Sequence, residues 1–205
     1  MKSPNKYIGD EKLAKLLEHY NCPTPIWAVK ARFVGSICSP NLDLRPTDVI
    51  SSFWPQGHEP RLETKEEADL FFKFFMGTWD EAFDKVAKNA FKLSSFKKDK
   101  DSLKQICQQR FDELEWGFIE GFWGGKEDMQ VPAYVAELMD SLSNIAGVYQ
   151  MLLKKLDNEA DLEEIAKTIS YSDKMTEKAI SFIIENSVLP RIDSLKREVN
   201  SGPLN

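Results

Sequence analysis

The sequence predicts an all-α protein, a single bundle of about eight helices that forms one domain over residues 1–205. Apolar residues recur at helical spacing along almost the whole chain, and no segment shows strand-like alternation or an Asn-Gly hairpin turn. With 42% hydrophobic and 11% aromatic residues, the chain can build a sizeable core. The loop at 124–131 is too short to link two domains, and we find no internal repeat.

Prolines divide the first part of the chain into short helices. Proline lacks the backbone N–H that a helix interior uses, but it is tolerated at the first helical position. We therefore expect helices over residues 10–20, 25–38 and 46–54, with a loop over 55–62.

The fourth helix has the clearest start signal. Thr64 and Glu67 are spaced as a capping box, in which the hydroxyl accepts from an early backbone N–H and the carboxylate reaches back. Apolar residues then follow the 3.6-residue period for over six turns, which predicts a helix that continues to Ala90.

Helical spacing also covers the rest of the chain. Gly124 and Gly125 are expected to end the fifth helix, and the last helix must bend or break at Pro190. The expected helices span residues 102–123, 132–156, 159–170 and 173–199, with a tail over 200–205.

The segment from Glu115 to Trp123 is the most unusual stretch, because it holds two Trp, two Phe and two Gly where helix formers are expected. A glycine inside a helix costs about 1 kcal/mol relative to alanine. Gly117 and Gly121 lie four residues apart, which predicts that another helix approaches closely over both of them.

Charge and composition argue against a nucleic-acid or membrane partner. The net charge is −6, and the one lysine-rich stretch, residues 92–104, is interrupted by Asp99 and Asp101, whereas phosphate binding needs clustered cations. The longest uncharged apolar run, residues 141–153, is 13 residues, short of the roughly 20 that span a bilayer. The first six residues are polar and do not resemble a signal peptide.

The three cysteines, Cys22, Cys38 and Cys107, are an odd and widely spaced set, which is typical of a reducing compartment. We therefore expect a cytoplasmic protein.

No catalytic, metal or phosphate-binding motif is present, so we expect no catalytic residue, metal site or cofactor. His19 and Cys22 could supply two zinc ligands, but His58 and Cys38 would have to complete the site from other segments. We interpret this pair as a surface histidine and a small buried cysteine.

Asp80 and Asp84 lie one turn apart, as in a hard-cation site. We interpret them instead as part of the solvated face of the fourth helix.

Two stretches resemble a known bacterial family. Residues 33–40 (Phe-Val-Gly-Ser-Ile-Cys-Ser-Pro), followed by Pro46 and residues 49–55, look like the opening helix pair of the YecA/YgfB-like proteins. Residues 116–121 (Trp-Gly-Phe-Ile-Glu-Gly) are similar to a later signature of that family, in a tighter form. The resemblance covers about residues 10–155 and leaves 157–199 unmatched.

This resemblance implies an all-helical, cytoplasmic protein with no assigned enzymatic activity. The chain departs from the family where Ala31 and Arg32 replace an expected Gly-Phe pair. It also lacks the Cys-rich metal-binding tail of some members, because no cysteine follows Cys107 and no histidine follows His58.

The leading functional hypothesis is a non-enzymatic adaptor that binds another protein. Glu113, Trp116, Glu120 and Trp123 are spaced by 3, 4 and 3 residues, which predicts one common helical face. Indoles beside carboxylates suit a cationic or amphipathic peptide. Trp54 is a further candidate for the contact surface.

Three alternatives stay open. An enzyme would need a carboxylate in a cleft with a raised pKa. Self-association would use apolar positions of the last helix that one face does not require, namely Ile180, Ile183, Ile184 and Leu195. A carrier would hold a small apolar ligand in a cavity between helices. That cavity would be lined by Phe71, Phe75, Trp79, Phe83 and Phe118.

Overall fold

The computed structural model describes residues 6–126, 129–158 and 161–201. Every regular element in these ranges is helical, which confirms the predicted all-α class. The elements are α1 (Asp10–His19), α2 (Ile26–Cys38), α3 (Pro46–Ser51), α4 (Lys65–Ala87), α5 (Lys100–Asp112), η1 (Glu113–Ile119), α6 (Glu120–Trp123), α7 (Ala133–Leu156), α8 (Leu162–Ile183), η2 (Ile184–Val188) and α9 (Leu189–Ser201), where η1 and η2 are π-helical.

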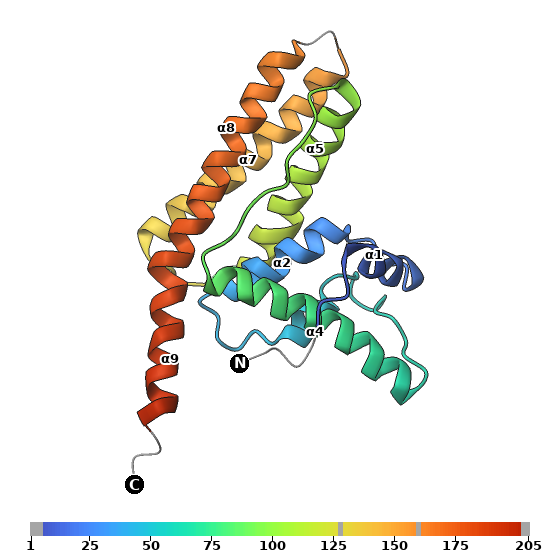
Figure 1. Ribbon diagram of the computed structural model, residues 1–205, viewed down its shortest axis with the longest axis vertical. Coiled ribbons are helices and arrows are strands. Elements are labelled where there is room, and N and C mark those ends of the chain that lie inside the picture. Colours follow the sequence, from blue (N-terminus) through green and yellow to red (C-terminus); the bar gives the residue numbers. More distant parts are fainter. Residues whose placement is uncertain (1–5, 127–128, 159–160, 202–205) are drawn as a thin grey trace.

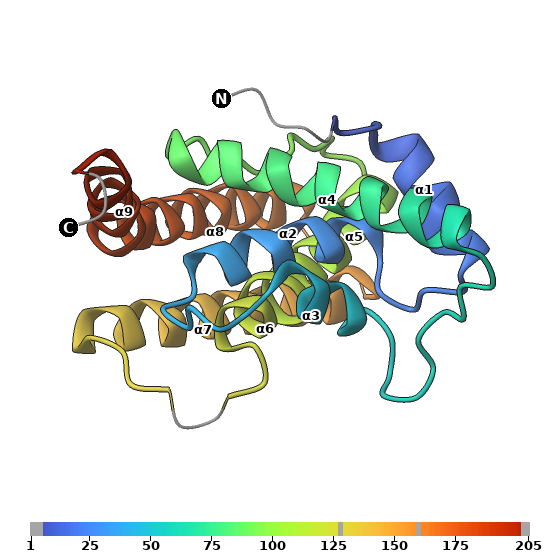
Figure 2. The ribbon, with the colours of Figure 1, turned by 90° about the horizontal axis from the view of Figure 1, so that it is seen from below.

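The helices form two connected groups. Helices α5, α7 and α8 pack side by side as a three-helix arm, and α1 to α4 gather at its base (Figure 1). Helix α2 lies between α4 on one side and η1 with α6 on the other (Figure 2). It therefore joins the two groups.

Helix α2 is buried over almost its whole length, because small and apolar residues occupy all of its faces. The predicted close approach over the two glycines is confirmed, and α2 is the approaching helix. A methyl group at Gly117 would lie 2.6 Å from the Ala31 Cβ, and one at Gly121 would overlap the backbone of Arg32. Gly35 of α2 is enclosed in the same way by the backbone of Phe118 and Phe122.

The start of α4 follows the predicted capping box with one difference. The Thr64 hydroxyl accepts from the Glu67 N–H at 3.1 Å, but the Glu67 carboxylate accepts from the N–H of Glu63, one residue further back. At its other end the helix stops at Ala87 instead of Ala90. Asn89 there adopts a left-handed backbone with φ 47°, which ends the helical path.

The third helix is also shorter than predicted and ends at Ser51 instead of Trp54. The hydroxyls of Ser51 and Ser52 donate to backbone carbonyls of the preceding turn, at Thr47 and Val49. Such local hydrogen bonds compete with helix propagation. Residues 52–55 leave the helix as a turn.

The predicted break between residues 170 and 173 is wrong, because α8 continues without interruption from Leu162 to Ile183. Its buried face runs on through Ile169, Ser172 and Thr176. Packing of this face against the arm overrides the weak helix propensity of the Ser-Tyr-Ser-Asp stretch. The predicted start at residue 159 lies outside the described residues.

The expected bend at Pro190 follows a π-helical segment. The chain passes from α8 through η2 into α9, which takes a different direction beyond the body of the protein (Figure 1). Helix α9 reaches Ser201, so residues 200 and 201 are helical, and the rest of the predicted tail lies outside the described ranges.

Three of the four apolar residues expected to drive self-association are not available for it. Ile180, Ile183 and Ile184 are fully buried in the core, and only Leu195 is exposed. The structure thus removes most of that argument.

The aromatic residues at the base of the arm fill the core by packing on one another. The Phe71 and Phe75 ring centroids lie 4.8 Å apart, and Phe53 and Trp54 pack against Phe75. Such edge and tilted contacts leave little space between rings. Among the described residues, no helix combines the length and apolarity needed to cross a bilayer.

Candidate functional site

A surface cavity of about 570 Å³ lies beside η1. It is lined by residues 23–25, which precede α2, and residues 52–55, which follow α3, together with Arg32, Asp112, Trp116 and Glu120. We call it the Trp116 cavity. Three of its wall residues are prolines, which fix the backbone where they stand.

The buried side chain of Arg32 binds a backbone carbonyl of the π-helical turn η1. Its Nε and Nη2 atoms donate to the Trp116 carbonyl oxygen at 2.9 and 2.6 Å, and Nη1 donates to the Ser52 carbonyl at 2.5 Å. Arg32 is only 6% exposed, and burial lowers its pKa although the Glu120 charge opposes that change. An arginine stays protonated even so, and its donors are largely occupied by these carbonyls.

The same turn presents Trp116 to solvent. Its side chain is 52% exposed, although its own carbonyl is tied to a buried arginine. Tryptophan buries a large area when it meets a partner, and it is enriched among the residues that dominate binding energy. The backbone that carries this exposed ring is packed against helix α2.

Two carboxylates of the cavity, Asp112 and Glu120, form no ion pair in the described part of the chain. Asp112 is 8% exposed and accepts from Trp27 Nε1 at 3.2 Å and Gln108 Nε2 at 2.8 Å, both of which are neutral donors. Glu120 is exposed. Across the described ranges, no cationic nitrogen lies within the 4.0 Å of an ion pair from either carboxylate.

Of the four residues predicted to share one face, Trp116 and Glu120 lie together, and Glu113 lies elsewhere. The wider π turn of η1 displaces residues that an α-helix would align. Trp116 and Glu120 line the Trp116 cavity, whereas Glu113 points to a different cavity. Trp123 is half-buried against the ring of Phe122, with centroids 5.2 Å apart.

Trp54 is also placed differently from the expectation. It is 5% exposed, its Nε1 donates to the Tyr20 carbonyl at 3.0 Å, and it forms part of the aromatic core. Only an edge of it can border the Trp116 cavity. Sequence reasoning missed Arg32, which comes from another helix, and also Asp112, although Asp112 precedes Trp116 by four residues and is therefore at α-helical spacing from it.

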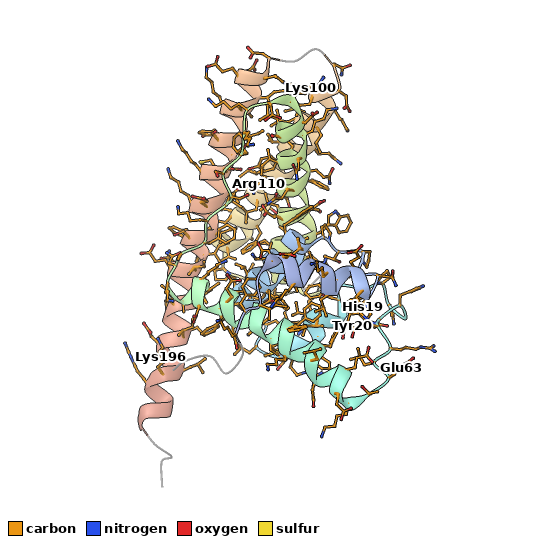
Figure 3. The ribbon with its side chains drawn as sticks, turned by 45° about the vertical axis from the view of Figure 1, so that its right-hand side comes forward. His19, Tyr20, Glu63, Lys100, Arg110 and Lys196 are labelled. Carbon is orange, nitrogen blue, oxygen red and sulfur yellow. The ribbon has the colours of Figure 1, made fainter. Side chains whose placement is uncertain are left out.

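Glu113 belongs to a buried charge cluster in the arm. Arg110 is fully buried and donates to Glu113 at 2.7 Å and to Asp173 at 3.1 Å, and Asp173 also accepts from the Tyr149 hydroxyl. Figure 3 shows Arg110 within the three-helix arm. The Ser94 carbonyl accepts from the same arginine, which fastens the non-helical segment before α5 to the arm.

Burial raises the pKa of Glu113, as an acid–base catalyst would require. Its two oxygens, however, already accept from Gln109 and Arg110. We interpret Glu113 as part of a structural ion pair, because both of its oxygens are held by side chains of the arm and one of these donors is the buried Arg110.

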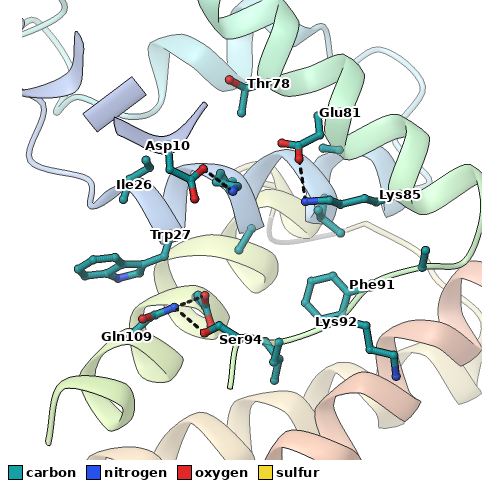
Figure 4. A pocket seen from close by; sticks show the side chains of 17 residues that line it. Asp10, Ile26, Trp27, Thr78, Glu81, Lys85, Phe91, Lys92, Ser94 and Gln109 are labelled. Atoms are coloured by element: carbon teal, nitrogen blue, oxygen red, sulfur yellow. Dashed lines mark hydrogen bonds and ion pairs between the residues drawn. The ribbon is translucent and has the colours of Figure 1, made fainter. Parts of the chain in front are cut away.

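A second cavity, of about 560 Å³, separates α2 and α4 from α5 (Figure 4). Trp27 and Phe91 line it, but so do the ion pairs Asp10–Lys30, at 2.7 Å, and Glu81–Lys85, at 3.1 Å. Its lining contains none of the five aromatic residues expected to form a ligand cavity. Of those five, Phe83 is 40% exposed, which contradicts its expected place inside.

Metal chemistry has no site in the described part of the chain, where no three His, Cys, Asp or Glu residues are grouped to hold an ion. The three cysteines are free thiols. Cys22 is hydrogen-bonded to the carbonyls of Thr24 and Phe53, and Cys38 is buried at the end of α2.

No protein-family model, curated protein or solved structure matches this chain. The resemblance to the YecA/YgfB-like proteins therefore stays a prediction from the sequence.

Proposed function

We propose that this protein is a non-enzymatic binding module, and that the Trp116 cavity receives a lysine or arginine side chain of a partner protein. One observation carries the proposal: an exposed tryptophan lies in a cavity with two carboxylates and one arginine, Arg32, and neither carboxylate forms an ion pair within the described residues.

The energetics favour a basic side chain over other occupants. A cation over an indole ring gains about 0.5–2 kcal/mol, depending on how much water is removed. Asp112 and Glu120 add Coulombic attraction, which is stronger at a partly buried site than in bulk water. Arg32 contributes one opposing charge, but the backbone carbonyls of Trp116 and Ser52 already occupy its guanidinium.

The alternative of a small apolar ligand has weaker support. The cavity between α2, α4 and α5 is large enough for a small molecule, for which about 300–1,000 Å³ is usual. Charged side chains in its lining would lose hydration without compensation when a wholly apolar ligand enters. An amphipathic ligand would suit it better.

Three free thiols support the cytoplasmic location that we propose, because oxidising compartments favour disulfides. The acidic composition supports a partner that is itself basic along the contacting segment.

The proposal is tested by selecting short peptides from a random displayed library on the purified protein. Peptides that the parent enriches should carry lysine or arginine, and their dissociation constants are then measured by calorimetry. Trp116→Ala should weaken binding by about tenfold, and Glu120→Gln by about threefold, in line with the loss of a cation–π contact and one charge.

Matched controls come from the opposite part of the molecule. Tyr171→Ala removes an aromatic ring on α8 that is 67% exposed, and Glu185→Gln removes an exposed carboxylate of η2. Neither should change the affinity. Enriched peptides without basic residues, or equal effects of Trp116→Ala and Tyr171→Ala, would refute the proposal.

A further inference from the structure

Another surface cavity, of about 480 Å³, adjoins the Trp116 cavity. Its lining contains an arginine and no carboxylate. It is lined by residues 19–21, Pro23, Trp54, Pro55, His58, Pro60 and Arg61, and we call it the Arg61 cavity. Both histidines of the chain line it, and no carboxylate does. Figure 3 labels His19 and Tyr20 at the base of the arm, where this cavity opens.

The cation of this cavity is available to a ligand. Arg61 is exposed and forms no ion pair with a carboxylate of the described residues. The Glu67 carboxylate adjoins the lining residue Tyr20, and its oxygens accept from the Tyr20 hydroxyl and the Glu63 N–H. Glu67 is not among the residues that line the cavity, and it forms no ion pair with Arg61.

The walls of the cavity are held by local structure. The His58 Nδ1–H donates to the Gln56 carbonyl at 3.3 Å, and the His19 ring packs edge-on against Tyr20, with centroids 4.7 Å apart. Asn21 turns the chain with a left-handed φ of 48° just after α1. These contacts position both imidazoles beside the arginine before any ligand arrives.

The two cavities share Pro23, Trp54 and Pro55 as a common wall. A ligand that crosses this wall would meet Trp116, Asp112 and Glu120 on one side and Arg61 with the two histidines on the other. The two cavities are therefore neighbours on the surface, and we call the pair the groove; one end holds Asp112 and Glu120, and the other holds Arg61. Pro23 and Pro55 at the middle offer apolar contact without charge, and the core residue Trp54 lies beside them.

We infer that the partner is an extended segment of another protein, with a basic side chain in the Trp116 cavity and an acidic side chain in the Arg61 cavity. This inference rests on the proposed function, because it adds a second anchor to the same bound segment. Because the two ends of the groove differ in charge, they favour a segment whose basic and acidic residues follow one another in one direction along the chain. They disfavour the reverse order. A carboxylate on Arg61 can accept two parallel N–H bonds from the guanidinium.

The test uses synthetic peptides that contain one arginine and one aspartate, joined by Gly-Ser spacers of increasing length. Each peptide is paired with a version in which serine replaces the aspartate, and dissociation constants are measured by calorimetry at low salt. For the spacer that spans the groove, the aspartate should improve affinity about three- to tenfold in the parent protein.

Arg61→Glu should abolish this gain, and a peptide with lysine in place of the aspartate should bind the Arg61→Glu protein better than it binds the parent. Arg197→Glu makes the same change in net charge on α9, far from the groove, and should leave the gain intact. Because Arg61 is exposed and makes no hydrogen bond in the described structure, its substitution leaves the fold unchanged.

The outcomes separate the inference from the function on which it rests. If peptides bind through arginine and Trp116 but the aspartate has no effect, or its effect survives Arg61→Glu, the inference is wrong while the proposed function stands. If no peptide shows Trp116-dependent binding, both are wrong. An aspartate effect lost only in Arg61→Glu supports both.

Discussion

Substituting Gly121 by alanine tests the packing that supports the Trp116 cavity. The added methyl group would lie 2.9 Å from the Arg32 carbonyl carbon and 3.0 Å from its Cα, and closer still to its oxygen. Carbon atoms in contact prefer about 3.5–4.0 Å. The obstacle is backbone on both sides, so α2 and α6 must move apart by several tenths of an ångström or more.

The expected magnitude follows from three contributions. Overpacking of this kind costs about 1–3 kcal/mol. Separation of α2 from η1 also strains the hydrogen bonds between Arg32 and the Trp116 carbonyl, a loss of about 1–3 kcal/mol for a buried charged donor. Replacing a helical glycine by alanine returns about 1 kcal/mol. The net destabilisation should be about 3 kcal/mol, or a fall in Tm of roughly 6–12 °C for a protein of this size.

The assay is urea unfolding followed by far-UV circular dichroism, with Gly147→Ala as the matched control. Gly147 is exposed in the middle of α7, and a methyl group there meets no atom within 4 Å. The control should be unchanged or more stable by up to about 1 kcal/mol. If Gly121→Ala behaves like Gly147→Ala, the close crossing of α2 and α6 is wrong.

Three further predictions concern the supporting structure. Arg110→Met should destabilise the protein by about 3–5 kcal/mol in urea unfolding, because it leaves the buried carboxylates that the arginine binds without a cation; an unchanged midpoint would contradict the buried cluster. Thr64→Ala should cost about 1 kcal/mol by removing the N-cap of α4, and Thr64→Ser should restore most of it. Burial raises the pKa of the Cys38 and Cys107 thiols to about 12, so only about one in ten thousand is a thiolate at pH 8. A thiol reagent should therefore modify these two only after unfolding, with Cys22 the first to react in the folded protein; rapid labelling of all three would contradict their burial.

The helix positions were largely predictable because periodicity, prolines and caps are local signals. The Gly117 and Gly121 crossing was predictable as well, since two costly glycines at helical spacing indicate a close neighbour. The identity of that neighbour, α2, was not, because contacts between residues far apart in sequence leave no local pattern.

The candidate site was harder to predict, for two physical reasons. The π-helical turn η1 lies between Glu113 and Glu120, and Glu113 lines a different cavity from Trp116 and Glu120, which α-helical spacing does not predict. Asp173 and one of the two donors to Asp112, Trp27, take part in contacts between different helices, and no sequence signal distinguishes an ion-paired carboxylate from an unpaired one. Trp116 alone among the predicted aromatic contacts is largely exposed.

The most direct measurement of the central claim is a double-mutant cycle between Glu120 and the basic residue of a selected peptide. Affinities are measured by calorimetry for the parent and Glu120→Gln proteins, each with the selected peptide and with its lysine replaced by glutamine. If the basic side chain binds in the Trp116 cavity, the two substitutions should be coupled by a factor of about three or more in the dissociation constant. This coupling should weaken as salt is added. The same cycle is measured with Asp112→Asn in place of Glu120→Gln. If the effects of the protein and peptide substitutions are additive in both cycles, the claim that this cavity receives a basic side chain is contradicted.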